Sequence, residues 1–248
     1  MKILLYDIET SPNLGYIWGK YEQDVIEYER EGHMLSFAYK WLGEKTVKAY
    51  SLPDFPLYKK EPENDKALVK KLWELFNEAD VVIAHNGDQF DMRKANAFFI
   101  ANGLTPPSPY KTVDTKKVAK RYFMFNSNKL DDLGNYLGLG RKAQTGGFSL
   151  WKGCMEGNME AWKKMVKYNK QDIVLLEEIY LKLLPWISNH PNVNIFDEKT
   201  AACPNCGGQH IQKRGKGANA LTTYQRYQCM DCGKWSKSKA ERTEISIR

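Results

Sequence analysis

The sequence of 248 residues contains no long hydrophobic run, and none approaches the roughly 18 apolar residues that a membrane-spanning helix needs. We expect no cleavable signal peptide, because Asp7 and Glu9 interrupt the apolar start too early. Internal repeats are also missing, which excludes a solenoid. These absences predict a soluble, cytoplasmic protein.

Cysteine is scarce and unevenly placed. Only Cys154 lies among residues 1–198, whereas Cys203 and Cys206, and Cys229 and Cys232, form two C-x-x-C pairs. This spacing is typical of a metal site rather than of a disulfide framework. We therefore expect a reducing, intracellular compartment, with Cys154 as a free thiol.

Net charge is missing from most of the chain. Residues 1–198 carry 27 Lys and Arg against 27 Asp and Glu, whereas residues 199–248 carry 10 against 3. The whole excess of +7 therefore lies in the last fifth of the sequence. A basic segment of this kind indicates an anionic partner, most often nucleic acid. The alternative is a solubilising tail.

An apolar content of 42% allows a sizeable core. Strands are predicted at 2–7, 14–18, 34–41 and 46–51, with 14–51 as an antiparallel meander beside the first strand and 20–32 without a clear pattern. Later strands at 81–84 and 111–113 alternate with helices at 65–77, 90–102, 115–125, 130–137 and 159–184, and 140–157 reads as a loop. This order predicts an α/β fold, a mixed sheet flanked by helices. We expect a domain over 1–186, a linker over 187–199 and a small domain over 200–248.

Two carboxylates stand at the end of the first predicted strand. Asp7 and Glu9 are two residues apart, so in a strand they point to the same face. Like charges held this close raise each other's pKa and cost stability unless a cation lies between them. Because hard divalent ions such as Mg²⁺ bind carboxylate oxygens, the pair predicts a metal site that needs further ligands.

Two later stretches offer such ligands. Asp91 lies just inside a predicted helix N-terminus, where backbone donors favour a carboxylate, although Asp88 or Asp91 could simply cap that helix. Tyr168 and Asp172 are four residues apart and share one face of the helix over 159–184. A carboxylate beside an apolar stripe is unusual without a partner. The alternative is a half-exposed Asp172.

The acidic stretches form three motifs: Asp7-x-Glu9, Asn86-x-x-x-Phe90-Asp91 and Tyr168-x-x-x-Asp172. In order and spacing they resemble the three exonuclease motifs of the DnaQ-like, or DEDD, superfamily. The tyrosine of the third motif indicates the tyrosine branch, and the second motif is most similar to proofreading domains of family-B DNA polymerases and their stand-alone relatives. The resemblance covers about residues 1–186, implies an RNase H-like fold, and favours Asp91 over Asp88.

The resemblance implies a metal-dependent 3′→5′ exonuclease that hydrolyses phosphodiester bonds at DNA ends, with single-stranded DNA as the expected substrate. Two Mg²⁺ or Mn²⁺ ions would be bound by Asp7, Glu9, Asp91 and Asp172, and Tyr168 would orient the attacking water. Two such ions stabilise the attacking and leaving oxygens of an in-line displacement. The alternatives are a ribonuclease, a structure-specific nuclease, and a non-catalytic nucleic-acid-binding or polymerase accessory subunit.

The two C-x-x-C-G turns predict a structural zinc site. Four thiolates from Cys203, Cys206, Cys229 and Cys232 make a closed tetrahedral Zn²⁺ site, with His210 as a substitute ligand. A segment of about 50 residues has little core, so the metal would largely hold it folded.

The C-terminal segment resembles zinc ribbons of transposases and other nucleic-acid proteins, in which basic side chains among aromatic ones suit phosphate contact and base stacking. The candidate nucleic-acid-binding residues are Arg141, Lys142, Lys213, Arg214, Lys216, Tyr224, Arg226, Tyr227 and Trp235. DNA is the expected partner, with RNA or a polymerase or other replication or repair protein as alternatives. A ribbon that docks a protein, or only caps the nuclease, is the competing interpretation.

Overall fold

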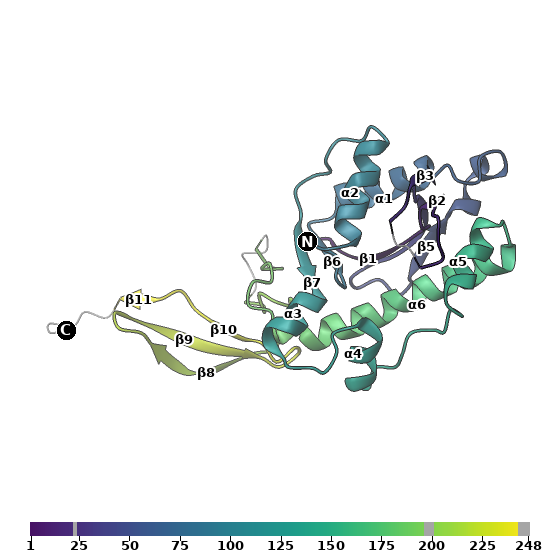
Figure 1. Ribbon diagram of the computed structural model, residues 1–248. Helices are drawn as coiled ribbons and strands as arrows, with labels where there is room; N and C mark the ends of the chain where they lie inside the picture. Colours follow the sequence, from purple (N-terminus) through teal and green to yellow (C-terminus); the bar gives the residue numbers. More distant parts are fainter. Residues whose placement is uncertain (22–23, 196–200, 243–248) are drawn as a thin grey trace. The chain divides into compact units, whose positions relative to one another are not determined.

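The computed structural model describes residues 1–21, 24–195 and 201–242 (Figure 1). Residues 196–199 of the predicted linker, and residues 200 and 243–248 of the predicted ribbon, lie outside the described residues. Contacts divide the chain into two compact units, Lys2–Ile179 and Tyr180–Arg248, with Met1 grouped with the second. Among the helices of the described ranges, none is both long and apolar enough to cross a membrane.

The first unit is built on a five-stranded sheet with the strand order β5-β4-β1-β6-β7. The central strand β1 (Ile3–Thr10) runs antiparallel to β4 (Met34–Trp41) and parallel to β6 (Val81–Ala84). The outer strands are β5 (Lys48–Ser51), antiparallel to β4, and β7 (Lys111–Asp114), parallel to β6. The apolar start of β1 is buried because helices cover the sheet on both faces. The predicted fold class, a mixed sheet flanked by helices, is therefore confirmed.

In the part of the chain that the structure describes, six α-helices accompany the sheet: α1 (Lys66–Glu78), α2 (Asp91–Ala101), α3 (Thr115–Tyr122), α4 (Leu130–Tyr136), α5 (Phe148–Met155) and α6 (Met159–Leu183). The alternation of β1 decides which helix meets which side chain. Tyr6 packs edge-on against Phe76 of α1, with ring centroids 4.8 Å apart. Its neighbour Asp7 points to the opposite face, where it meets Asn169 of α6. Asp7 and Glu9 are thereby directed towards α6.

The expectation that 14–18 joins a meander beside β1 is wrong. β2 (Leu14–Tyr16) pairs instead with β3 (Glu27–Arg30) in a separate two-stranded sheet. β3 lies in the stretch 20–32, and all four of its residues are exposed. A strand without a buried face has no apolar alternation, so the sequence offered no pattern to detect.

The prediction of a loop over 140–157 is also wrong in part, because residues 148–155 form α5. This helix buries Leu150 and Cys154, which are one turn apart. Two turns of helix are too short to show a clear period, and glycines at 146, 147, 153 and 157 favoured a loop. The helix predicted over 115–125 ends earlier, at Tyr122.

The second unit begins with the last turn of α6, followed by the 3₁₀ turn Leu184–Trp186. Its sheet contains β8 (Ile211–Ala218), β9 (Thr222–Cys229), β10 (Trp235–Lys237) and β11 (Glu241–Arg242), with β9 antiparallel to each of the others. The cysteine turns pack beside the end of α6. The buried Asn205 amide donates to the Leu184 carbonyl at 2.7 Å, and the Lys234 ammonium donates to the Ile187 carbonyl at 2.8 Å.

Candidate active site

Three of the predicted acids converge in the first unit. Carboxylate oxygens of Asp7, Glu9 and Asp172 lie within 4.8 Å of one another. Asp7 and Glu9 come from alternate positions of β1, and Asp172 from α6, where its side chain is only 1% exposed. Three carboxylates held this close repel strongly, so the arrangement needs positive charge to be stable.

Asp91 lies beside this cluster, at the edge of β1. β6 pairs only with Ile3–Leu5 of β1, then leaves the sheet for the turn that leads into α2. The following edge of β1 is therefore open, and the Asp91 carboxylate accepts the Ile8 amide at 3.4 Å. Asp91 is the first residue of α2 and is 4% exposed. The short β6 thus leaves room for Asp91 to bond the backbone of β1 at Ile8.

Asp88 lies in a different environment. Its carboxylate is partly exposed and pairs with the Lys117 ammonium at 2.7 Å. Asp114 accepts backbone amides from both sides, including Asn86 at 3.0 Å and Lys116 at 2.9 Å. It caps α3 and ties down the turn in which Asn86 adopts φ +67°.

Tyr168 and Asp172 lie one turn apart on α6, and both contact the ammonium of Lys142. The sequence predicted Lys142 as a nucleic-acid-binding residue. The Lys142 ammonium donates to Asp172 Oδ2 at 2.7 Å and to the Tyr168 hydroxyl at 3.2 Å. Lys142 comes from the Gly-rich loop after α4, where its amide donates to Asp131 at 2.7 Å. Arg141, by contrast, is exposed and contacts Asn135. The structure thus separates two adjacent residues that the sequence presented as one basic pair.

Asn169 is a site residue that sequence reasoning missed. It is fully buried, and its amide donates to Asp7 Oδ2 at 2.8 Å. Its carbonyl accepts the Ser36 hydroxyl at 3.4 Å, which fixes the amide's orientation. The sequence feature that could have indicated Asn169 is its position as a polar residue next to Tyr168, in a helix whose neighbouring turn is apolar. Its partner becomes apparent only from the packing of α6 on β1.

Burial raises the pKa of each of these four carboxyls, and neighbouring carboxylates add to the rise. The pKa of Asp7 lies well above its usual value because of burial, followed by the charges of Asp91 and Glu9. Burial, followed by Asp172, raises the pKa of Glu9 to about 8, and burial raises that of Asp91 to about 6. The pKa of Asp172 is also raised by burial, against the opposing effect of Lys142.

These groups fit a divalent cation. Asp172 Oδ1 is buried and, among the described residues, has no hydrogen-bond partner, which is costly for a carboxylate. Oxygen ligands of this type and number suit Mg²⁺ or Mn²⁺. The ammonium of Lys142 supplies positive charge at the same carboxylate from the other side.

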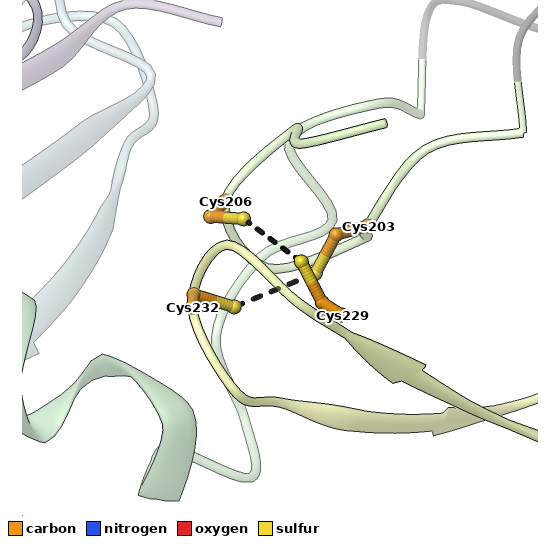
Figure 2. Close-up of side chains that lie close together, drawn as sticks. All are labelled: Cys203, Cys206, Cys229 and Cys232. Atoms are coloured by element: carbon orange, nitrogen blue, oxygen red, sulfur yellow. Dashed lines mark hydrogen bonds between the residues drawn. The ribbon is translucent and has the colours of Figure 1, made fainter. Parts of the chain in front are cut away.

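The four C-terminal cysteines also converge (Figure 2). The sulfurs of Cys203 and Cys232 are 3.8 Å apart, and those of Cys206 and Cys229 are 3.7 Å apart. These distances are far longer than a disulfide. They equal the edge, about 3.8 Å, of a tetrahedron of sulfurs each about 2.3 Å from a central zinc ion. The cluster therefore fits Zn²⁺.

The two cysteine turns have the same backbone design. Gly207 donates its amide to the Cys203 carbonyl and Gly233 to the Cys229 carbonyl, each at 2.9 Å. Both glycines have φ near +80°, a region that side chains disfavour. His210, the predicted substitute ligand, instead pairs with Asp231 at 2.6 Å.

The other candidate nucleic-acid-binding residues all lie on the ribbon sheet. Lys213, Arg214 and Lys216 belong to β8 and are exposed. β9 carries Tyr224, Arg226 and Tyr227, and β10 carries the exposed Trp235.

In the first unit, a pocket of about 470 Å³ adjoins the end of β1. It lies between Ser11–Leu14 and two residues of α5, Phe148 and Met155.

Comparisons with known proteins agree on the fold. Residues 26–184 match the RNase_H superfamily, and no curated protein sequence matches the chain. The family B DNA polymerase from the hyperthermophilic archaeon Pyrobaculum calidifontis is similar in structure, with a TM-score of 0.56 and 15% identity over 75% of this chain. At this identity the likeness shows the fold alone, and the chain spans only 25% of that polymerase. Since the family match covers well over half of its residues, the chain belongs to the RNase_H superfamily.

Proposed function

We propose that the chain is a metal-dependent exonuclease that removes nucleotides from the 3′ ends of DNA, with single-stranded DNA as substrate. The observation that carries the proposal is the convergence of Asp7, Glu9 and Asp172, with Asp91 on the adjoining strand edge. Members of the RNase_H superfamily are generally nucleases, which supports hydrolysis of phosphodiester bonds. The 3′→5′ direction and the choice of DNA rest on the resemblance of the three motifs.

In this proposal Asp7, Glu9, Asp91 and Asp172 hold two Mg²⁺ or Mn²⁺ ions. When bound, the ions would stabilise the attacking and leaving oxygens of an in-line displacement. Asn169 holds the Asp7 carboxylate in one orientation through its 2.8 Å hydrogen bond. Without that hydrogen bond, the Asp7 carboxylate would have to be ordered at the moment of reaction.

Tyr168 orients rather than deprotonates the attacking water. Burial, followed by the Asp172 charge, raises the pKa of its hydroxyl above the usual value, so the group stays protonated at neutral pH. A protonated phenol can donate and accept hydrogen bonds but is a poor base. The Lys142 ammonium, 3.2 Å from the same hydroxyl, is in place to bind a phosphate oxygen of the substrate.

We further propose that residues 1–186 form the nuclease domain and 200–248 a zinc ribbon, joined by the linker 187–199. Cys203, Cys206, Cys229 and Cys232 would hold one structural Zn²⁺, which the sulfur spacing supports. A ribbon that binds nucleic acid would hold the substrate. One that binds a replication or repair protein would instead recruit the nuclease to it.

End-labelled DNA and RNA oligonucleotides test the nuclease. With Mg²⁺ or Mn²⁺, the wild-type chain should shorten single-stranded DNA stepwise from its 3′ end, and Asp7→Asn should lower the rate by about 10³-fold or more. Asp88→Asn is the matched control, because Asp88 pairs with Lys117 outside the cluster, and should stay within a few-fold of wild type. Cleavage of RNA but not of DNA would show that the substrate is RNA instead of DNA. No metal-dependent cleavage of either polymer would overturn the proposal.

A further inference from the structure

The ribbon sheet has two open faces. None of residues 211–228 and 235–240 is buried, although an antiparallel sheet normally covers at least one face with apolar side chains. Residues 211–228 and 235–240 form no hydrophobic face that would fit an apolar partner. A partner for it must therefore be polar or charged.

Register assigns the side chains to two different faces. Because directly opposed residues share a face, the pairs Trp235 with Gln228 and Lys237 with Arg226 place β10 and alternate residues of β9 together. The Trp235 face is defined by Tyr224, Arg226, Trp235 and Lys237, whereas Arg214 lies in the bulge and is assigned to neither face. The Tyr227 face is defined by Lys213, Lys216 and Tyr227. The sequence presented these residues as one set.

The aromatic groups of the Trp235 face are held in place. Tyr224 lies opposite Gly217, and a Cβ on that glycine would come within 2.5 Å of the tyrosine ring. The ring therefore lies across the glycine backbone, close to the sheet. The Lys237 ammonium lies 5.1 Å from the centre of the same ring. Trp235, on the neighbouring strand, is 52% exposed and offers an uncovered indole.

The charge of these strands has one sign. β8, β9 and β10 contain five Lys and Arg residues and no Asp or Glu. Within the described ranges, none of the five forms an ion pair. Two of them, Arg226 and Lys237, lie on the Trp235 face beside the two aromatic rings.

We propose that the Trp235 face binds single-stranded nucleic acid, with bases stacked on Trp235 and Tyr224 and phosphates bound by Arg226 and Lys237. Exposed rings between cations bind unpaired bases, whose faces a duplex hides. The Tyr227 face has one ring and two lysines, and is the weaker candidate. The proposal deepens the proposed function of the ribbon and does not depend on catalysis by the acidic cluster.

Binding of a fluorescent oligonucleotide, measured by anisotropy, tests this face in the full chain. Asp7→Asn serves as the background so that the probe is not degraded. Trp235→Ala should weaken single-strand binding about 5- to 150-fold, the usual effect of losing one stacked base. Arg226→Gln with Lys237→Gln should flatten the slope of log affinity against log salt by about 1.4, for two phosphate contacts.

Lys213→Gln with Lys216→Gln is the matched control, since it removes the same charge from the Tyr227 face. It should change affinity by about threefold or less, as expected of screened, non-contacting charges. Zinc content of one ion per chain would show that each variant keeps its ribbon folded.

Equal losses from the two double variants, unchanged binding by Trp235→Ala, or preference for a duplex of the same sequence would each overturn the proposal. The proposal would also be overturned if residues 201–242 of the wild-type chain did not contribute to nucleic-acid binding. Cleavage of short oligonucleotides by a chain with Asp7 intact and Trp235→Ala reports on the nuclease separately. If the wild-type chain bound single strands but did not cleave them, the result would count against the nuclease alone.

Discussion

The Lys142 ammonium lies 2.7 Å from Asp172 Oδ2, so a lysine neutralises part of the acidic cluster. Burial lowers the pKa of this lysine, but the charge and hydrogen bond of Asp172, together with Tyr168 and Asp7, raise the pKa above its usual value. The ammonium therefore stays charged wherever the acids are ionised. The ammonium thus balances the negative charge of Asp172, whose side chain is the most deeply buried of the cluster.

Lys142→Met should destabilise the metal-free first unit by about 1–2 kcal/mol, less than a fully buried pair because Lys142 is 29% exposed. Added Mg²⁺ should reduce this loss, since it supplies positive charge to the same acids. Urea unfolding with and without Mg²⁺ measures both effects. Lys40→Met, which removes the pair with Glu177 at 2.5 Å, is the control and should lose stability equally in both buffers. Identical Mg²⁺ dependence of the two variants would contradict the role of Lys142.

Glu9→Gln should make the metal-free protein more stable and the enzyme inactive. Burial and Asp172 raise the folded-state pKa of Glu9 to about 8, so at neutral pH this side chain must take up a proton on folding, which opposes folding. A neutral amide of the same shape needs no proton and should stabilise the unit by about 1–2 kcal/mol. Thermal unfolding of metal-free protein measures the gain, and added Mg²⁺ should reverse the order of the two proteins. A variant less stable than wild type without metal would show that the cluster carries no repulsion.

His85 should remain neutral in the folded protein to about pH 4. Burial lowers its pKa to about 4, and its ring nitrogens lie 2.9 Å from the Thr115 hydroxyl and from the Asn128 carbonyl. Because the carbonyl can only accept, Nε2 carries the proton and Nδ1 accepts from Thr115. The ring's NMR shifts should therefore not titrate near pH 6.5.

The same shift fixes the sign of a pH effect on stability. A base whose folded pKa is lowered binds fewer protons in the folded state, so its contribution is present above pH 6.5 and lost as pH falls towards 4. The loss amounts to about 3 kcal/mol relative to His85→Gln. Unfolding of the two proteins at several pH values measures it. A constant difference between pH 7 and pH 4 would contradict it.

The cysteines should fall into two reactivity classes. With zinc bound, none of the five thiols should react rapidly with a disulfide reagent, since four are ligands and Cys154 is 1% exposed. Removing zinc should release four fast thiols per chain. Cys154 should stay slow, because burial raises the pKa of its thiol to about 12. Cys154→Ala should leave the number of fast thiols unchanged, and five fast thiols in wild type would contradict the assignment.

Tyr6→Phe should raise stability slightly. The Tyr6 side chain is fully buried, and its hydroxyl finds no hydrogen-bond partner among the described residues. Removing a desolvated, unpaired hydroxyl should gain about 1 kcal/mol while the contact with Phe76 is kept. Tyr180→Phe is the control and should cost a similar amount, because that hydroxyl bonds to His190 at 2.7 Å. Chemical unfolding decides both, and a loss in Tyr6→Phe would indicate a partner for its hydroxyl.

Local patterns in the sequence were enough to predict several features of this protein. The two-residue spacing of Asp7 and Glu9 and the four-residue spacing of Tyr168 and Asp172 follow from the periods of strand and helix. The apolar run of β1 and the order of helices and strands predicted the mixed sheet. The paired cysteines predicted their own convergence, because each C-x-x-C-G turn is a local structure.

Features that depend on distant partners needed the tertiary structure. Asn169 reaches Asp7 across 162 positions, and Lys142 reaches Asp172 from a glycine-rich loop with no periodic pattern of its own. The strand register, with its bulge between Lys213 and Lys216, decided which ribbon side chains share a face. Sequence periodicity records only which way a side chain points from its own strand or helix. The partner that it meets is set by packing between elements, and no local pattern carries that information.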